Sequence, residues 1–363
     1  MKMSNKTYFC TLKPISKFFF GGERTFGENG TAKINYLVRS NPFPQQTTIL
    51  GMLRFELLKQ FKLLPITPIN ELVVDETIGK QSFMISEINP KYGFIENISP
   101  IFICSENDKM TIAPRDFVTY FDHKSKLITE NWSVIKSPDS AFLYGSNNEF
   151  ELKNIPEFSH KKTYLPHFKT VIGDSVLMNY DKNTKQGVFI SDSQIGITKN
   201  SKNKDDKGFY KQFYYRMNKG YAFGFYLEAS EEINEKSSIV FLGGEKSAFL
   251  LTIKDSPTEN FNSCFGIDDT KIGTKITLLS DAFVNEDIYK FCNLGLVNTV
   301  QFRNIETKIN QTISFHKGIT KSEKVLNLLA SGSVLFPNNF EEVKRILTNN
   351  NFKKIGYNIY KID

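Results

Sequence analysis

The stretch Phe20-Gly21-Gly22-Glu23-Arg24-Thr25-Phe26 is echoed later in the chain by Leu242-Gly243-Gly244-Glu245-Lys246-Ser247-Ala248-Phe249. Each copy leaves an apolar, β-prone segment and reaches paired glycines, an acid, a base, a hydroxyl and an aromatic residue. This order predicts a strand followed by a tight loop in each half of the chain. Glycine lets a backbone approach a phosphate or sugar, and the base adds charge, so the repeat indicates a duplicated scaffold that grips a polyanion. The alternative is that each glycine pair only turns the chain.

Composition favours a globular, nucleic-acid-binding protein. The chain has 363 residues, of which 40% are hydrophobic, enough for a substantial core and for two domains of about 180 residues or one large domain. Its 46 Lys and Arg against 39 Asp and Glu give a net charge of +7, which suits a polyanionic partner. The 33 Phe and 15 Tyr favour β-rich packing and provide flat faces for stacked bases.

Cysteine usage and hydropathy indicate a cytoplasmic protein. The four cysteines are far apart and form no CxxC pair (Cys10, Cys104, Cys264, Cys292), so neither a zinc ribbon nor a disulfide framework is expected. No stretch approaches the length of about eighteen apolar residues that a membrane helix requires, and the N-terminus does not resemble a signal peptide.

A helix is predicted after the breaker sequence at residues 41–46. Thr47 or Thr48 can cap it, and its apolar residues recur at helical spacing (Leu50, Leu53, Leu57, Phe61). Because Arg39 and Ser40 directly precede it, backbone amides, the positive end of the helix dipole and a guanidinium could meet one phosphate there. Gly51 costs about 1 kcal/mol of helix propensity, so we expect it to contact another backbone or a ligand closely.

A long β-hairpin is predicted over residues 193–219, with a polar tip. Its bases lie beside five aromatic residues that include Phe209 and Tyr210. A basic arm with aromatic rings is suited to single-stranded RNA, because cations bind phosphates and rings stack on bases. The alternative is a solvated hairpin whose rings pack inward. The bases are Lys199, Lys202, Lys204, Lys207, Lys211, Arg216 and Lys219.

The remaining pattern predicts two α+β halves. Strand-like residues 82–112 end at Ala113-Pro114-Arg115-Asp116, residues 122–165 are loop-rich, and a domain boundary is expected near residue 175. After a polar insertion at 254–275, a glycine turn within 325–336 precedes a helix at 339–348 and a last strand at 357–362. We therefore predict two ferredoxin-like (RRM-like) domains, 1–175 and 176–363, with glycine-rich loops and a protruding β-hairpin.

The sequence carries few catalytic signals. The four histidines (His123, His160, His167, His316) are dispersed and form no HExxH pattern, so no metal site or other cofactor is expected. The Gly-Gly-Glu stretches lack the neighbouring aspartates of a two-metal nucleotidyl site, which disfavours polymerase or cyclase activity. Metal-free RNA cleavage that uses His167 or His316 stays open.

Five segments together resemble a known family. They are residues 39–44 (RSNPFP), residues 47–54, the hairpin around Ile195-Gly196-Ile197, Leu242-Gly243-Gly244-Glu245, and Ala330-Ser331-Gly332-Ser333-Val334. In this order they are similar to the RAMP superfamily of CRISPR proteins. Within it, they resemble the handle-binding third subunit of type III-B (Cmr) effector complexes.

The resemblance implies a non-catalytic scaffold. Such a subunit anchors the 5′ handle of the crRNA, docks the large polymerase-like subunit, contacts the neighbouring RAMP backbone subunit, meets target RNA only indirectly, and uses the hairpin as a thumb. Guide-processing RAMP nucleases tend to carry an early catalytic histidine, whereas the first histidine here is His123. The expected RNA-contacting residues are Gly21, Gly22, Arg24, Arg39, Ser40, Thr47, Thr48, Arg115, Lys199, Lys204, Lys207, Phe209, Tyr210, Lys211, Arg216, Gly243, Gly244, Lys246, Gly332 and Ser333.

Three other functions are kept as alternatives. The first is a metal-independent, guide-processing endoribonuclease of the RAMP superfamily. The second is the equivalent handle-binding subunit of a type III-A complex, which shares the architecture. The third is an architectural subunit that binds only proteins.

Overall fold

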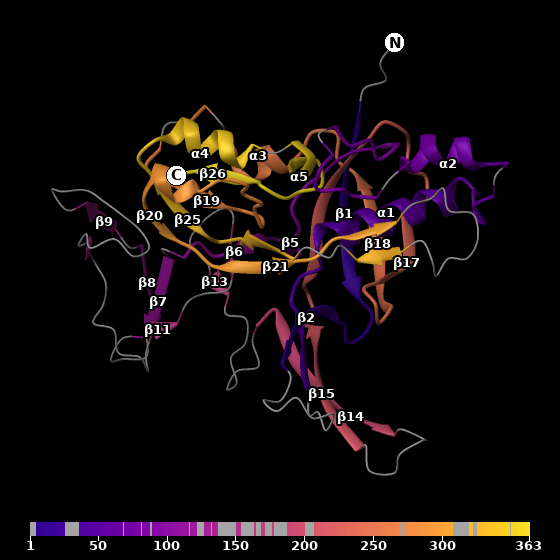
Figure 1. Cartoon of the computed structure of the whole chain (residues 1–363), viewed down its shortest axis with the longest axis horizontal. Coiled ribbons are helices and arrows are strands. Elements are labelled where there is room, and N and C mark those ends of the chain that lie inside the picture. The colour runs from indigo at the N-terminus through magenta and orange to yellow at the C-terminus, as the bar shows by residue number, and fades with distance from the viewer. Residues whose placement is uncertain are drawn as a thin grey trace.

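A computed structural model provides the structure of the chain. It describes residues 5–25, 36–67, 69–80, 82–87, 89–115, 117–121, 127–131, 133–136, 150–153, 163–164, 168–170, 176–177, 187–199, 207–268, 270–271, 273–307, 319–321, 325–348 and 350–363. The described part is a mixed α/β structure in which antiparallel sheets dominate (Figure 1).

The largest sheet has nine strands, and all of its strand pairs are antiparallel. Strand β1 pairs with β16 along one edge and with β18 along the other. Its alternating sequence gives it two distinct faces: Tyr8, Cys10 and Leu12 are at most 1% exposed, and the residues between them face the other side. The strand order is β13 (Val176–Leu177), β12 (Phe168–Thr170), β6 (Lys109–Ile112), β5 (Phe102–Cys104), β16 (Ala222–Ala229), β1 (Lys6–Pro14), β18 (Ser247–Asp255) and β17 (Ser237–Leu242), with β4 (Ile95–Ile98) also paired to β16.

Helix α1 (Gln46–Gln60) packs on one face of this sheet and confirms the helix predicted there. Its leucines, Leu53 among them, enter the main core together with Leu227 and Leu251 of the sheet. The helix starts earlier than predicted: Gln45 is the N-cap residue, without a side-chain cap, so neither Thr47 nor Thr48 caps it. The expected close contact of Gly51 with another backbone is also wrong, because a Cβ atom there would meet nothing within 4 Å.

The chain crosses between strands β1 and β4 through α1 and α2 (Glu71–Ile78). Because β1 and β4 both pair antiparallel with β16, they run parallel to each other with β16 between them. This is a split β-α-β arrangement. Between β16 and β18 the chain forms the edge strand β17 instead of a second helix.

A second sheet belongs to the C-terminal part. Its order is β20 (Cys292–Leu296), β25 (Val334–Pro337), β19 (Ile276–Leu278) and β26 (Tyr360–Ile362). Strands β25 and β26 flank β19 and are connected by α4 (Phe340–Leu347) and α5 (Asn350–Lys354), whereas the short 3₁₀ helix η1 (Ile288–Phe291) connects β19 to β20. The predicted helix at 339–348 and the final strand are confirmed, and Leu278, Val343 and Leu347 form part of a separate core.

The predicted hairpin is confirmed as β14 (Phe189–Lys199) and β15 (Lys207–Met217), and it projects from the body of the molecule (Figure 1). It continues into β3 (Tyr36–Asn41), which pairs parallel with β15, and into β2 (Phe20–Thr25). The predicted tip between the two strands lies outside the described residues. Strand β3 therefore joins the hairpin to β2, the strand that carries the first glycine pair.

Two regions predicted as irregular contain regular structure. The polar insertion at 254–275 includes helix α3 (Phe261–Phe265), whose Phe261 and Phe265 are buried against the largest sheet. The stretch 122–165 includes the short strands β8 (Leu127–Asn131), β9 (Ser133–Lys136), β10 (Phe150–Lys153) and β11 (Thr163–Tyr164), preceded by β7 (Phe117–Phe121). Two further strand pairs join β21 (Thr299–Phe302) to β24 (Leu326–Leu329) and β22 (Ile305–Thr307) to β23 (Ile319–Lys321).

The two predicted halves, 1–175 and 176–363, share the largest sheet. Strand β1 comes from the first half, while its neighbours β16 and β18 come from the second. Strands β12 and β13, on either side of residue 175, pair with each other.

Candidate nucleic-acid interface

The first glycine pair lies inside a strand. Gly21 and Gly22 belong to β2, and the pairing of β2 with β3 shifts register between Gly21 and Arg24. A Cβ atom on Gly22 would stand well under 3.0 Å from the Arg39 carbonyl oxygen, closer than real Cβ atoms come, whereas one on Gly21 would meet nothing within 4 Å. The expected tight loop after the strand is therefore wrong for this copy: the glycines belong to an irregular strand.

The second glycine pair forms the turn between β17 and β18, as predicted. The Lys246 backbone N–H donates to the Gly243 carbonyl oxygen at 3.1 Å, and Gly243 has a φ of +73°, which favours glycine. A Cβ atom on Gly243 would lie 2.8 Å from the Phe19 carbonyl oxygen. The two glycine segments, far apart in sequence, thus lie side by side.

Two buried hydroxyls hold the segment before the first glycine pair. Ser247 Oγ, from the second copy, accepts a hydrogen bond from the Phe19 N–H at 3.0 Å. Ser40 Oγ accepts one from the Phe20 N–H at 2.8 Å. Because Ser40 is 6% exposed, its side chain positions the strand and does not face solvent.

Cations and aromatic rings meet at the base of the hairpin. The Arg39 guanidinium lies 5.7 Å from the centroid of the Phe213 ring, and Lys211 Nζ lies 4.9 Å from the same centroid. On the other face of β15, to which Tyr214 points, Lys17 Nζ lies 4.3 Å from the centroid of the Tyr214 ring. These distances are within the range of cation–π attraction. Residues 39, 211, 213, 214 and 17 together are called the cation–ring cluster.

The cluster contains Lys17, which the sequence analysis missed. Its signal was its position just before the apolar run Phe18–Phe20, so the strand that enters the glycine pair also starts with a base. Lys17 Nζ donates to Gln194 Oε1 of the hairpin at 2.8 Å, which ties this segment to β14.

The other predicted hairpin residues differ in their surroundings. The Arg216 guanidinium donates to Asp192 Oδ2 at 2.9 and 3.0 Å, so this base is held by a carboxylate across the hairpin. Lys199 pairs with Lys207 at the far end of the described ladder, and Phe209 and Tyr210 follow in β15. The side chains of these four residues and of Arg24 lie outside the description, as does the whole of Lys204.

Lys246 and Gly244 are exposed in the β17–β18 turn, and Thr47 and Thr48 are half-buried in the first turn of α1.

The third glycine turn, at Gly332, lies in a different part of the molecule. Gly332 has a φ of +82°, and a Cβ atom there would lie 2.7 Å from the Ala113 carbonyl oxygen. The Arg115 N–H donates to the Gly332 carbonyl oxygen at 2.9 Å, and burial lowers the pKa of the Arg115 guanidinium. Ser333 is fully buried, with its Oγ donating to the Ala330 carbonyl oxygen at 2.6 Å. This turn joins the C-terminal sheet to the chain after β6, so Arg115, Gly332 and Ser333 are not brought to the cation–ring cluster.

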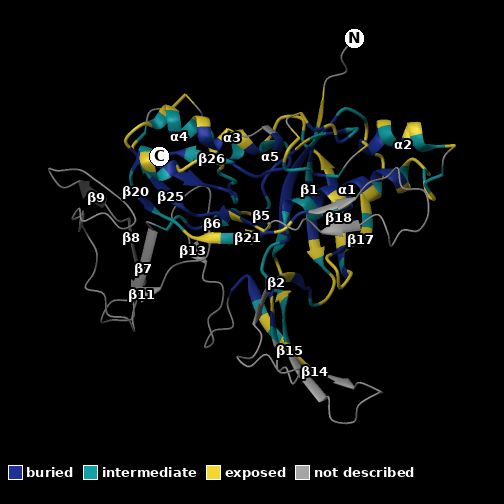
Figure 2. Cartoon of the chain, in the orientation of Figure 1, coloured by how far each residue is buried: buried dark blue, intermediate teal, exposed yellow. Residues whose placement is uncertain are grey.

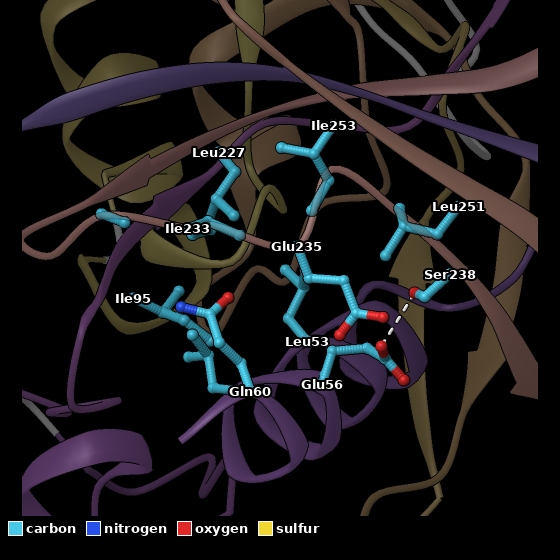
Figure 3. Close-up of a pocket in the computed structure, with 12 residues that line it drawn as sticks. Leu53, Glu56, Gln60, Ile95, Leu227, Ile233, Glu235, Ser238, Leu251 and Ile253 are labelled. Carbon is cyan, nitrogen blue, oxygen red and sulfur yellow. Dashed lines mark hydrogen bonds between the residues drawn. The ribbon is translucent and has the colours of Figure 1, made fainter. Parts of the chain in front are cut away.

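A cavity between α1 and the largest sheet is too small for a nucleotide. Its walls are mostly apolar, and at its mouth Glu56 Oε2 accepts a hydrogen bond from Ser238 Oγ at 2.8 Å (Figure 3). Its volume of about 20 Å³ has room for about one water molecule.

The described residues contain neither a metal-binding cluster nor a membrane-spanning helix. No group of three His, Cys, Asp or Glu side chains there could hold a metal ion. All four histidines lie outside those residues. No helix in the described part of the chain is long and apolar enough to cross a bilayer.

The antiparallel sheets, the split β-α-β arrangement, the projecting hairpin and the adjoining glycine segments are the features expected of a RAMP-like CRISPR subunit. A family model described as CRISPR-associated protein (Cas_Cmr3) matches residues 10–362, and the chain belongs to this family. No curated protein sequence is similar enough to count as a match.

One of the matching solved structures agrees at the level of the fold, and two others are less similar. A chain in a cryo-EM structure of the type III-B Cmr-beta complex bound to cognate target RNA matches with a TM-score of 0.50 and 13% identity, covering 98% of this chain and 96% of that one. A second structure of that complex, with AMPPnP, matches with a TM-score of 0.48 and 14% identity over 97% of this chain and 95% of that one. A Csm3–Csm4 subcomplex of a type III-A complex matches with a TM-score of 0.37 and 12% identity over 92% and 94%.

Proposed function

We propose that this subunit anchors the 5′ handle of the crRNA in a type III-B effector complex that acts in antiviral defence. In this proposal it also docks the large polymerase-like subunit and the neighbouring RAMP backbone subunit, and it cleaves no RNA. The family supports its place in a type III CRISPR complex. The strand orders of both sheets support two ferredoxin-like units, each of which has one helical crossover.

The cation–ring cluster carries the RNA-binding proposal. Arg39 and Lys211 are exposed, and in the described part of the chain neither makes an ion pair with a carboxylate, in contrast to Arg216. They offer positive charge to phosphates, while the half-buried rings of Phe213 and Tyr214 offer faces to unstacked bases. The exposed turn with Lys246 lies on the other side of the Phe19–Phe20 segment and extends the positive surface.

The decisive experiment distinguishes phosphate contacts made by Arg39 and Lys211 from a general effect of the protein's positive charge. The probe is the crRNA that copurifies with the complex assembled from the neighbouring genes, and binding to the double variant Arg39→Ala/Lys211→Ala is measured at several salt concentrations. The loss of two phosphate contacts should reduce the magnitude of the negative slope of log K against log salt concentration by about 1.4. The matched control is Lys290→Ala, which removes an exposed lysine of η1 that lies 3.9 Å from Asp287. An unchanged slope in the double variant would contradict the proposal.

Guide processing by His167 or His316 is tested separately. Purified protein is incubated with repeat RNA in EDTA, and we expect the RNA to remain intact. Cleavage that disappears in His167→Ala or His316→Ala would establish the endoribonuclease instead.

A further inference from the structure

The face of the largest sheet that points away from α1 is covered at one end and open at the other. Near β16 and β5, the rings of Phe9, Phe102 and Tyr226 are packed under Phe261 and Phe265 of α3. At the β17 end, nothing in the described structure takes the place of α3. The same sheet face therefore changes from a packed layer to an open one.

The open end of this face is apolar. Ile239 is 56%, Phe241 63%, Leu250 38% and Ile15 55% exposed. Ile239 is directly opposite Leu250, and Phe241 is opposite Ala248, to whose carbonyl oxygen the Ile15 N–H donates. The four side chains thus form one continuous surface, here called the β17 patch, which is among the exposed regions in Figure 2.

Strand β17 is also the last strand of the sheet. The Ile253 N–H donates to the Lys236 carbonyl oxygen at 2.9 Å, and hydrogen-bonded pairs alternate along an antiparallel ladder. Residues 238, 240 and 242 therefore bond to β18, and the N–H and C=O groups of Ile239 and Phe241 point to the open edge. Such an edge is a template for another strand.

The rim of the patch is basic. Lys13 and Lys254 lie on the same face of β1 and β18, and Lys246 lies in the adjoining turn, all exposed, against the single carboxylate of Glu245 in that turn. Pairing with a second copy of this chain would bring these lysines together, whereas a strand with carboxylates would complement them.

We propose that β17 accepts an extended segment of another protein, with apolar side chains on one face and carboxylates at its ends, by β-strand addition. Three of the four patch side chains (Ile239, Leu250 and Ile15) are aliphatic and have no flat face on which a base could stack, so Phe241 is the one aromatic ring of the patch. The free backbone groups of Ile239 and Phe241 match a strand. The patch shares no residue with the cation–ring cluster, and only Lys246 of its rim is also a predicted RNA contact. The inference is carried by the open β17 edge and therefore does not depend on the RNA-binding proposal.

The test uses hydrogen exchange in the complex purified with the proteins of the neighbouring genes, measured before and after treatment with ribonuclease. The outward amides of Ile239 and Phe241 are compared with the inward amides of Ser238 and Val240 in the same sample. We expect the two sets to exchange within about threefold of each other. Outward amides that exchange more than about tenfold faster would overturn the proposal, as would protection that ribonuclease abolishes, which would mark RNA as the occupant.

A proline variant makes the test independent of exchange. Ile239→Pro removes an N–H that β18 does not use, and proline is tolerated on edge strands. We expect at least a tenfold drop in carbodiimide crosslinks from Lys13 or Lys246 to carboxylates of another subunit, with an unchanged melting temperature. The matched variant Ile239→Thr keeps the N–H and should lose less than threefold. Equal crosslinking in both variants, or a dimer of the purified chain by light scattering, would reject strand addition by another protein.

Discussion

The two glycine pairs are adjacent in space but belong to different kinds of structure. Gly22 lies in an irregular strand whose neighbour, β3, presses a carbonyl oxygen against it. Gly243 begins a hairpin turn and needs a left-handed backbone. The same sequence pattern therefore meets two separate steric requirements, and the two segments lie together because Gly243 and Ser247 pack against Phe19.

The largest expected effect is at Gly22. Gly22→Ala places a methyl group against the Arg39 carbonyl oxygen, which is backbone and cannot rotate away. We expect a loss of about 3 kcal/mol in the free energy of unfolding, measured by denaturant titration. Gly21→Ala, whose Cβ would meet nothing within 4 Å, is the matched control and should change stability by less than about 1 kcal/mol. Equal losses in both variants would show that the close approach at Gly22 is not the cause.

The second effect is at Gly243. Gly243→Ala should cost about 2 kcal/mol, because an alanine is strained at a φ of +73° and its Cβ would crowd the Phe19 carbonyl oxygen. Gly244→Ala, in open space, serves as the control in the same thermal unfolding experiment. If Gly243→Ala proved neutral, the turn would be free to move away from Phe19, and the two segments would not form one unit.

The third effect concerns the hydroxyls between the segments. Ser247→Ala leaves the Phe19 N–H without its acceptor, and Ser40→Ala does the same to the Phe20 N–H. Each should cost about 1 to 2 kcal/mol. A double-mutant cycle measures whether the two bonds support the same strand segment. A coupling energy near zero would mean that Phe19 and Phe20 are held independently.

The smallest expected effect concerns Asp281, which lies beside the third glycine turn, at Gly332. Asp281 Oδ1 accepts a hydrogen bond from the Ser331 N–H at 2.9 Å, and burial raises the pKa of this carboxyl from 3.8 to about 6. Between these values the folded chain binds more protons than the unfolded chain, so stability from this group is present below about pH 4 and falls as pH rises through 6.

Asp281→Asn should therefore be more stable relative to the native chain at pH 7 than at pH 4, by about 1 kcal/mol. This free-energy difference is smaller than the raised pKa of Asp281 alone would give, because the residue is only partly buried and solvent weakens the effect. Unfolding titrations at both pH values measure the difference. A pH-independent difference would contradict the raised pKa.

Sequence patterns within short segments predicted the elements that form within those same segments. Helix α1 followed from the spacing of Leu50, Leu53 and Leu57, and the hairpin followed from two β-prone runs around a polar tip. Helix α3 also had a readable signal that was missed: Asn260 and Ser263 form a capping box, directly before the Phe261 and Phe265 pair at helical spacing.

The contacts that make the site are not local. Nothing in the sequence near Phe19 states that Ser247 and Gly243 will pack against it, because strand partners are chosen by the whole fold. For the same reason, Ser40 and Ser333 could not be recognised as buried. The sequence analysis identified the glycine pairs and several hairpin residues, whereas Lys17 and the separate position of the Gly332 turn required the structure.

The position of β1 has a consequence for synthesis of the chain. Its partners β16 and β18 begin at Ala222 and Ser247, so the ribosome releases the strand about two hundred residues before either partner exists. At roughly 5 to 20 residues per second, this strand, whose Tyr8, Cys10 and Leu12 are buried in the folded chain, waits on the order of ten seconds or more with both edges unpaired. We expect nascent β1 to be a binding site for chaperones, and the sheet cannot close around it until the middle of the chain has been made.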